Sequence, residues 1–273
     1  MHRRSAGVVT RARSIRWTLR DILAEHPALY LPIARRKYPD SVLGNDTRLM
    51  VDGFTRSAVT FATIAFQMAQ RRPVRVAHTL HSSGHLIAAA RRRVPAIVTI
   101  REPEEVVLSA VIREPYVTLA QALTAYSRFY STLRPFRSDF VVAEFDDITR
   151  DFGFVVRRVN QRFGTEFDEF EHTEANVDRC FEVIEARSQR PPWSKALGEF
   201  ECGIIGFEDY QRIVAVFERE GWLPQLAVPE TRVQRPSGER EDLKNALRAD
   251  LAGRRLSDRL TNARHAYAAF VAD

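Results

Sequence analysis

From about Thr47 onward, short apolar runs alternate with longer amphipathic stretches, and this alternation restricts the chain to few folds. Apolar runs of this length predict strands buried on both faces, whereas the amphipathic stretches have the apolar spacing of helices. Because the connections are short, the strands should form a parallel sheet wrapped by helices. We therefore predict an α/β fold with strands at 48–54, 74–80, 95–100 and 140–145 and helices at 57–72, 83–93, 104–113, 117–133 and 151–163.

The alternating segments are preceded by a basic arm and followed by a helical extension. From about residue 172 the apolar spacing is helical, with loops expected at Pro191-Pro192, Gly221 and 233–238. We predict an N-terminal arm at 1–40 and a single α/β domain at 41–273 that ends in the helical extension.

Charge is concentrated in the arm. The chain carries a net charge of +6, but residues 1–37 hold nine basic and two acidic side chains, and the remainder holds 32 basic and 33 acidic ones. The body is thus nearly neutral, which argues against a nucleic-acid partner. The arm mixes its arginines with Trp17, Leu19 and Ile22, a composition that suits a helix on an anionic membrane surface. We expect peripheral membrane contact through residues 1–37; the alternative is a helix docked on the body with its arginines in solvent.

Cysteine content and the lengths of the apolar runs indicate the compartment. The two cysteines, Cys180 and Cys202, form no CxxC pair, so neither a disulfide framework nor a cysteine zinc site is indicated. The longest nearly apolar run, Ala58–Ala69, is too short to span a bilayer. We expect a cytoplasmic protein that touches a membrane only at its surface.

The loop after the first predicted strand suits an anion. Ligands of parallel sheets bind where strands end and helices begin, and such a turn presents backbone N–H groups and the positive end of a helix dipole. Arg56, Ser57 and Thr60 add a cation and two hydroxyls. The alternative is a polar helix N-cap with a surface arginine. The loop lacks the GxxxxGK[ST] pattern, which disfavours a nucleotide kinase.

The loop after the third predicted strand contains a second cation and hydroxyl. Arg101 ends the strand, and Ser109 follows eight residues later inside the next helix. The two side chains are placed to converge on one phosphate. The alternative is an exposed arginine paired with Glu102 or Glu104.

Together these two loops resemble the sulfotransferase superfamily, whose members use 3′-phosphoadenosine 5′-phosphosulfate as donor. The resemblance rests on the pattern G-F-x-R-S-x-x-T-F followed by R-x-P-x-x-x-x-x-S, and extends to FDDI (145–148) and RPSGEREDLKNAL (235–247). It implies a P-loop-type parallel sheet. It also implies that the 3′-phosphate is held by Arg101 and Ser109, that the adenine packs on Phe61, and that the 5′-phosphosulfate is held by the loop residues Arg56, Ser57, Ala58, Val59 and Thr60. The alternative for Phe61 is a core residue that faces Phe66 and Ile64.

The first loop departs from the family pattern at three positions. Thr55 stands where proline is usual, and Ala58-Val59 replaces Gly-Thr or Gly-Asn. Because alanine disfavours positive φ, we expect a loop conformation that accepts a β-carbon at residue 58. Val59 also removes one hydroxyl donor.

Three of the seven histidines lie after the second predicted strand, at positions 78, 81 and 85. Histidine has the unperturbed pKa that best suits a general base near neutral pH. In cytosolic family members this strand ends in Lys-Thr-His, so the resemblance implies that His78 takes the lysine position and His81 is nearest to the base. A one-residue slip would exchange the roles, and a loop histidine bonded to backbone is the structural alternative. We expect His85 to be structural and no metal site, because no HExxH pattern or nearby acid completes one.

The expected activity is transfer of a sulfuryl group from the nucleotide donor to a hydroxyl or amine of a small-molecule, carbohydrate or lipid acceptor, with Arg56, His81 and His78 as catalytic residues. The alternative is a catalytically degenerate nucleotide-binding or scaffold protein of the same fold. The sequence indicates neither the acceptor nor the oligomeric state.

Overall fold

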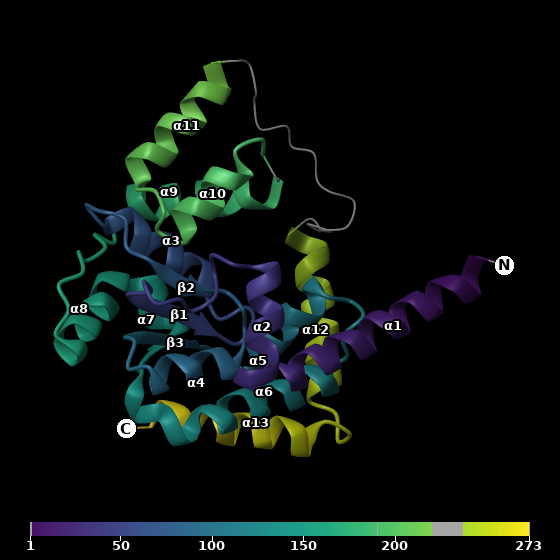
Figure 1. The fold of residues 1–273 in the computed structure, drawn as a ribbon. Coiled ribbons are helices and arrows are strands. Elements are labelled where there is room, and N and C mark those ends of the chain that lie inside the picture. The colour runs from purple at the N-terminus through teal and green to yellow at the C-terminus, as the bar shows by residue number, and fades with distance from the viewer. Residues whose placement is uncertain (1, 190, 220–236, 273) are drawn as a thin grey trace.

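The fold is built on a four-stranded parallel sheet, as Figure 1 shows. The structure, a computed structural model, describes residues 2–189, 191–219 and 237–272. In these ranges the strand order is β2-β1-β3-β4, with all neighbours parallel. The strands are β1 (Leu49–Gly53), β2 (Val76–His78), β3 (Ala96–Ile100) and β4 (Val141–Glu144). The predicted α/β class and all four predicted strands are confirmed.

Helices cover both faces of the sheet because successive strand residues point to opposite sides. Val51 and Ile97 face one cluster of buried side chains, whereas Met50 and Val98 face the other. The first cluster packs under α3 (Val59–Ala69), α8 (Phe152–Phe163), α9 (Glu174–Gln189) and α10 (Ser194–Glu201), and the second under α4 (Ser83–Arg91), α5 (Pro103–Arg113), α6 (Leu119–Leu133) and α13 (Ser257–Val271).

The remaining elements connect these layers. They are η1 (Arg134–Asp139), α7 (Phe145–Arg150), α11 (Phe207–Arg219) and α12 (Ser237–Leu251). The expected loop at Pro191-Pro192 lies between α9 and α10, whereas Gly221 and residues 233–236 lie outside the described residues. Among the residues with a described position, every helix is too short or too polar to cross a bilayer.

The sheet contains a topological switch point between β1 and β3. The chain leaves β1 for α3 on one face, and leaves β3 for α5 on the other. The loops after these adjacent strands therefore diverge at the carboxyl edge of the sheet, where ligands of open parallel sheets bind. We refer to the place between these two loops as the crevice.

The N-terminal arm forms two helices, α1 (His2–Leu23) and α2 (Pro27–Lys37), and the second half of α1 is docked on the body. Gln121 of α6 bonds Ser14 and Thr18, and Arg128 of α6 pairs with Asp21 and Glu25. The division of the chain at residue 40 stays a prediction.

The turn between α1 and α2 is fastened to the start of α4. The Ala24 carbonyl accepts bonds from Ser82 Oγ at 2.6 Å and from the Gly84 N–H at 2.9 Å. A β-carbon at Gly84 would come within 2.8 Å of that carbonyl oxygen, so only glycine permits this approach. Ser82 Oγ also caps α4 by accepting from the His85 N–H.

Candidate active site

The β1–α3 loop contains two left-handed residues that are not glycine. Arg56 has φ 71° and Ala58 has φ 69°, and Ala58 is the N-cap of α3. The expectation that residue 58 takes a conformation favourable to a β-carbon is therefore wrong. Residue 58 has a backbone conformation that glycine usually adopts although it is alanine, and this lowers the stability of the fold by about 1–2 kcal/mol.

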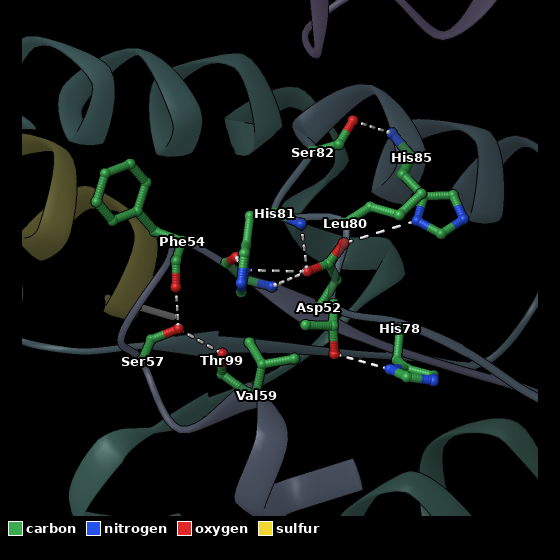
Figure 2. Close-up of polar contacts among 12 residues, drawn as sticks. Asp52, Phe54, Ser57, Val59, His78, Leu80, His81, Ser82, His85 and Thr99 are labelled. Atoms are coloured by element: carbon green, nitrogen blue, oxygen red, sulfur yellow. Dashed lines mark hydrogen bonds and ion pairs between the residues drawn. The ribbon is translucent and has the colours of Figure 1, made fainter. Parts of the chain in front are cut away.

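Buried hydrogen bonds hold this conformation in place. Ser57 Oγ donates to the Phe54 carbonyl at 2.5 Å and lies 2.7 Å from Thr99 Oγ1 on β3, as Figure 2 shows. Tyr130 OH donates to the Thr99 carbonyl at 2.9 Å. A β-carbon at Gly53 would collide with Thr99, so β1 and the loop pack directly on β3. Ser57 thus serves the loop's internal structure.

The other loop residues divide into buried and accessible ones. Val59 and Phe61 are buried, and Phe61 contacts the rings of Phe170 and Phe181. Thr60 is half-buried on the first turn of α3. Within the described part of the chain, the backbone N–H groups of residues 57–61 have no hydrogen-bond acceptor. These donors and the α3 dipole form a positive surface at the end of β1.

Arg56 and Ser109 meet across the switch point. Arg56 Nε donates to Ser109 Oγ at 2.9 Å, although 53 residues separate them in the sequence. The predicted convergence of Arg101 and Ser109 on one phosphate stays a prediction, and the hydroxyl of Ser109 accepts from Arg56 in the structure. The bond joins the α3 side of the crevice to the α5 side.

Arg101 lies at the end of β3 with its guanidinium over the Phe145 ring, 4.0 Å from the ring centroid. Phe145 begins α7, so the FDDI segment supplies a platform that orients the arginine. Arg101 also lies 3.5 Å from Glu105, one turn into α5. The alternative pairing of Arg101 with Glu102 or Glu104 is not what the structure shows.

Two further cations surround Glu105. Lys244 and Arg248, both on α12, approach its carboxylate at 2.8 and 2.9 Å. Three positive side chains thus share one carboxylate at the start of α5, and Arg248 also pairs with Glu241. Sequence reasoning missed Lys244 and Arg248 because only the packing of α12 on α5 brings them to the site.

His78 is enclosed and neutral. Its Nδ1 lies 2.7 Å from Thr79 Oγ1 and its Nε2 lies 3.4 Å from Cys202 Sγ. Burial and the nearby Arg187 charge lower the pKa of His78 to about 3. This side chain presents no positive charge to the crevice at neutral pH.

His81 is oriented by the end of β1. Its Nδ1 lies 3.0 Å from the Gly53 carbonyl oxygen, which can only accept, so the neutral ring carries its proton on Nδ1 and a lone pair on Nε2. Burial lowers the pKa of His81, an effect opposed by the Asp52 charge. The residue has φ 50°, and a quarter of its side chain is exposed, which leaves the ring open on one side.

A buried carboxylate that the sequence reasoning missed lies under this histidine. Asp52 Oδ1 accepts from the backbone N–H groups of Gly53 and His81 at 2.9 and 3.0 Å, and Asp52 Oδ2 faces His85 Nδ1 at 3.6 Å. Burial raises the pKa of Asp52, but the nearby imidazoles of His85 and His81 and the Gly53 N–H outweigh it, so the pKa lies below its usual value. His85 Nε2 accepts a hydrogen bond from the Leu43 N–H, and this bond holds the imidazole ring in its orientation.

Sequence patterns could not identify Asp52 as a site residue, because a single acidic residue within an apolar run indicates only a strand. Figure 2 shows His81 and His85 on opposite sides of its carboxylate. Within the described ranges, no group of His, Cys, Asp and Glu is arranged to hold a metal ion.

Comparison with known proteins gives no independent indication of the family. Neither a protein-family model nor a curated protein matches this chain.

Proposed function

We propose that this protein transfers a sulfuryl group from 3′-phosphoadenosine 5′-phosphosulfate to a hydroxyl or amine of a small-molecule, carbohydrate or lipid acceptor, on a P-loop-type sheet. The observation that carries the proposal is the contact of Arg56 with Ser109 across the switch point. It brings one residue from each of the two predicted phosphate-binding loops into a single crevice.

The surroundings of the crevice fit a doubly anionic nucleotide. At the α3 end, the N–H groups of residues 57–61 and the Arg56 side chain would hold the 5′-phosphosulfate. At the α5 end, Arg101 and Ser109 would hold the 3′-phosphate, with Lys244 and Arg248 as further cations beside Glu105. The apolar side chains of Val59 and Phe61 are buried and contribute to the shape of the loop from the core.

The proton chemistry falls to His81. In the transfer, the bond between sulfur and the bridging phosphate oxygen breaks, the leaving phosphate keeps the electron pair, and sulfur bonds to the acceptor oxygen or nitrogen. His81 Nε2 takes the acceptor proton, because the bond of Nδ1 to Gly53 leaves that lone pair available. Arg56 stabilises charge on the leaving phosphate. His78 is neutral and enclosed, so its part is to support Thr79 rather than to supply charge.

A second candidate is nucleotide binding without transfer. It is favoured by the burial of Val59, which offers no hydroxyl at a position where the family pattern has a polar residue. The two candidates share the donor site and differ only in turnover.

Calorimetry with 3′-phosphoadenosine 5′-phosphate, the donor product, tests the shared site. Arg101→Ala should weaken binding roughly 10- to 150-fold and Ser109→Ala only about fivefold, because the arginine makes a charge-assisted contact and the serine a neutral one. Arg92→Ala, at the exposed far end of α4, is the matched control and should leave affinity unchanged. Absence of binding at millimolar ligand would overturn the proposal.

Transfer of radiolabelled sulfate separates the two candidates. Arg56→Ala should reduce turnover more than product affinity, since its partner is charge that develops during transfer. Tight product binding without transfer to any hydroxyl or amine acceptor would leave nucleotide binding as the function.

A further inference from the structure

The outer face of the α1–α2 pair is unusual in composition for a surface that water covers. Six large apolar side chains on it are between 41% and 61% exposed. Exposed basic side chains accompany these apolar residues and lie on the same two helices. We define the arm surface as the apolar residues Ile15, Leu19, Ile22, Leu29, Ile33 and Tyr38 together with the basic residues Arg11, Arg13, Arg16, Arg35, Arg36 and Lys37.

The apolar residues form stripes along the helices. Ile15, Leu19 and Ile22 follow the i, i+4, i+7 spacing that puts them on one face of α1, and Leu29 and Ile33 repeat the i, i+4 spacing on α2. Figure 1 shows α1 running outward from the body toward the N-terminus, and Ile15, Leu19 and Ile22 are 41–61% exposed.

Docking on the body does not account for these stripes. The contacts of α1 with α6 run through Trp17 and the bonds of Gln121 and Arg128, and Ile15 and Ile22 lie at the edge of this contact beside Thr18. Between Arg11 and Tyr38 the acidic residues are Asp21 and Glu25, and both are paired with Arg128. The exposed side chains of this range are therefore apolar and basic, and the nearest exposed acid beyond it is Asp40.

We propose that the arm surface binds an anionic lipid bilayer. Such a surface needs apolar side chains that enter the headgroup region and cations near them that meet the lipid charge, and the arm surface supplies exposed side chains of both kinds on two consecutive helices. A second copy of the chain would bring like charge against like charge. A nucleic acid would cover the cations and leave the apolar stripes in water. The proposal is independent of sulfuryl transfer.

Co-sedimentation of the full-length chain with vesicles provides the test. The protein should bind phosphatidylcholine vesicles that contain phosphatidylserine and should not bind pure phosphatidylcholine vesicles. Binding should weaken as salt is raised, since exposed charges are screened.

Point substitutions identify the surface. Leu19→Gln should weaken binding roughly tenfold or more, because an inserted leucine is lost, and Arg16→Gln should weaken it about fivefold. Val216→Gln on α11, 44% exposed, and Arg72→Gln are the matched controls and should leave binding unchanged. Circular dichroism checks that each variant is folded, which is expected since all four positions are exposed or only half-buried.

Several results would overturn the proposal. They are the absence of binding to phosphatidylserine vesicles, equal binding to neutral vesicles, or full binding by the Leu19→Gln variant. Tighter binding to an oligonucleotide, insensitive to Leu19→Gln but lost with Arg16→Gln, would assign the arm surface to nucleic acid instead.

Discussion

The enclosed histidine at the end of β2 predicts a specific dependence of stability on pH. His78 is 2% exposed and its pKa is lowered from 6.5 to about 3, with burial as the main cause. The folded state therefore excludes a proton that the unfolded chain takes up as the pH falls below about 6.5. The stability that depends on the neutral ring is complete above that pH and is lost progressively toward pH 3.

The magnitude follows from linkage. One proton taken up only by the unfolded chain lowers the free energy of unfolding by about 1.4 kcal/mol for each pH unit, so His78 alone should remove roughly 3 kcal/mol between pH 6.5 and 4.5. The lowered pKa values of Asp52 and His81 act in the same direction, so the wild-type slope should exceed that of a single group.

Urea unfolding at several pH values, followed by tryptophan fluorescence and circular dichroism, measures this slope. His78→Gln removes the titrating group, so its slope should be lower than wild type by about 1.4 kcal/mol per pH unit, while the contributions of the other groups cancel in the comparison. His265→Gln, at an exposed position on α13, is the matched control. Identical slopes for His78→Gln and wild type would refute the argument that His78 stays neutral in the folded protein.

Three further predictions concern the crevice. Ala58→Gly should stabilise the protein by roughly 0.5–1 kcal/mol, because relief of the left-handed strain exceeds the entropy that glycine adds to the unfolded chain. The control Ala120→Gly on α6 should destabilise the protein by about 1 kcal/mol. A loss of stability at both positions in urea titrations would contradict the strain argument. Asp52→Ala should lower the free energy of unfolding by about 2–6 kcal/mol, because it leaves the N–H groups of Gly53 and His81 without their acceptor. Asp52→Asn keeps an acceptor oxygen and should lower the free energy of unfolding clearly less. Equal losses would mean that Asp52 does not stabilise the protein through these two bonds. His81→Ala should lower the transfer rate about 10²–10⁴-fold with product binding intact, and the wild-type rate should fall in acid below the ordinary histidine pKa; a near-normal rate would move the base elsewhere.

Sequence patterns were sufficient for the sheet because each strand is a continuous apolar run between turn residues. The predicted end of β2 was too late, since Thr79 and His81 both take positive φ and the chain leaves the sheet after His78. Helix α7 was not predicted because six residues are too few to show a period of 3.6. These errors lie at element ends, where local turns decide the structure.

The site was harder to predict because its contacts link distant segments. The left-handed conformation of Ala58 contradicts local propensity and depends on the bonds of Ser57 to Thr99 and of Tyr130 to β3. The inward turn of Asp21 and Glu25 depends on Arg128, more than a hundred residues away. Such cases are decided by tertiary packing, which no short window of sequence contains.

The bonds that the Ala24 carbonyl accepts from Ser82 and Gly84 also bear on how the chain can be altered in the laboratory. Removing the arm would take the acceptor away from two buried donors and open the packing beside the loop that holds His81. A shortened chain would thus be expected to lose the geometry of its histidine loop along with the arm surface. A substitution at residue 84 would disturb the same contact, since a β-carbon there would come within 2.8 Å of the Ala24 carbonyl oxygen. Truncation of the arm and substitution of Gly84 should therefore damage the same loop from opposite sides.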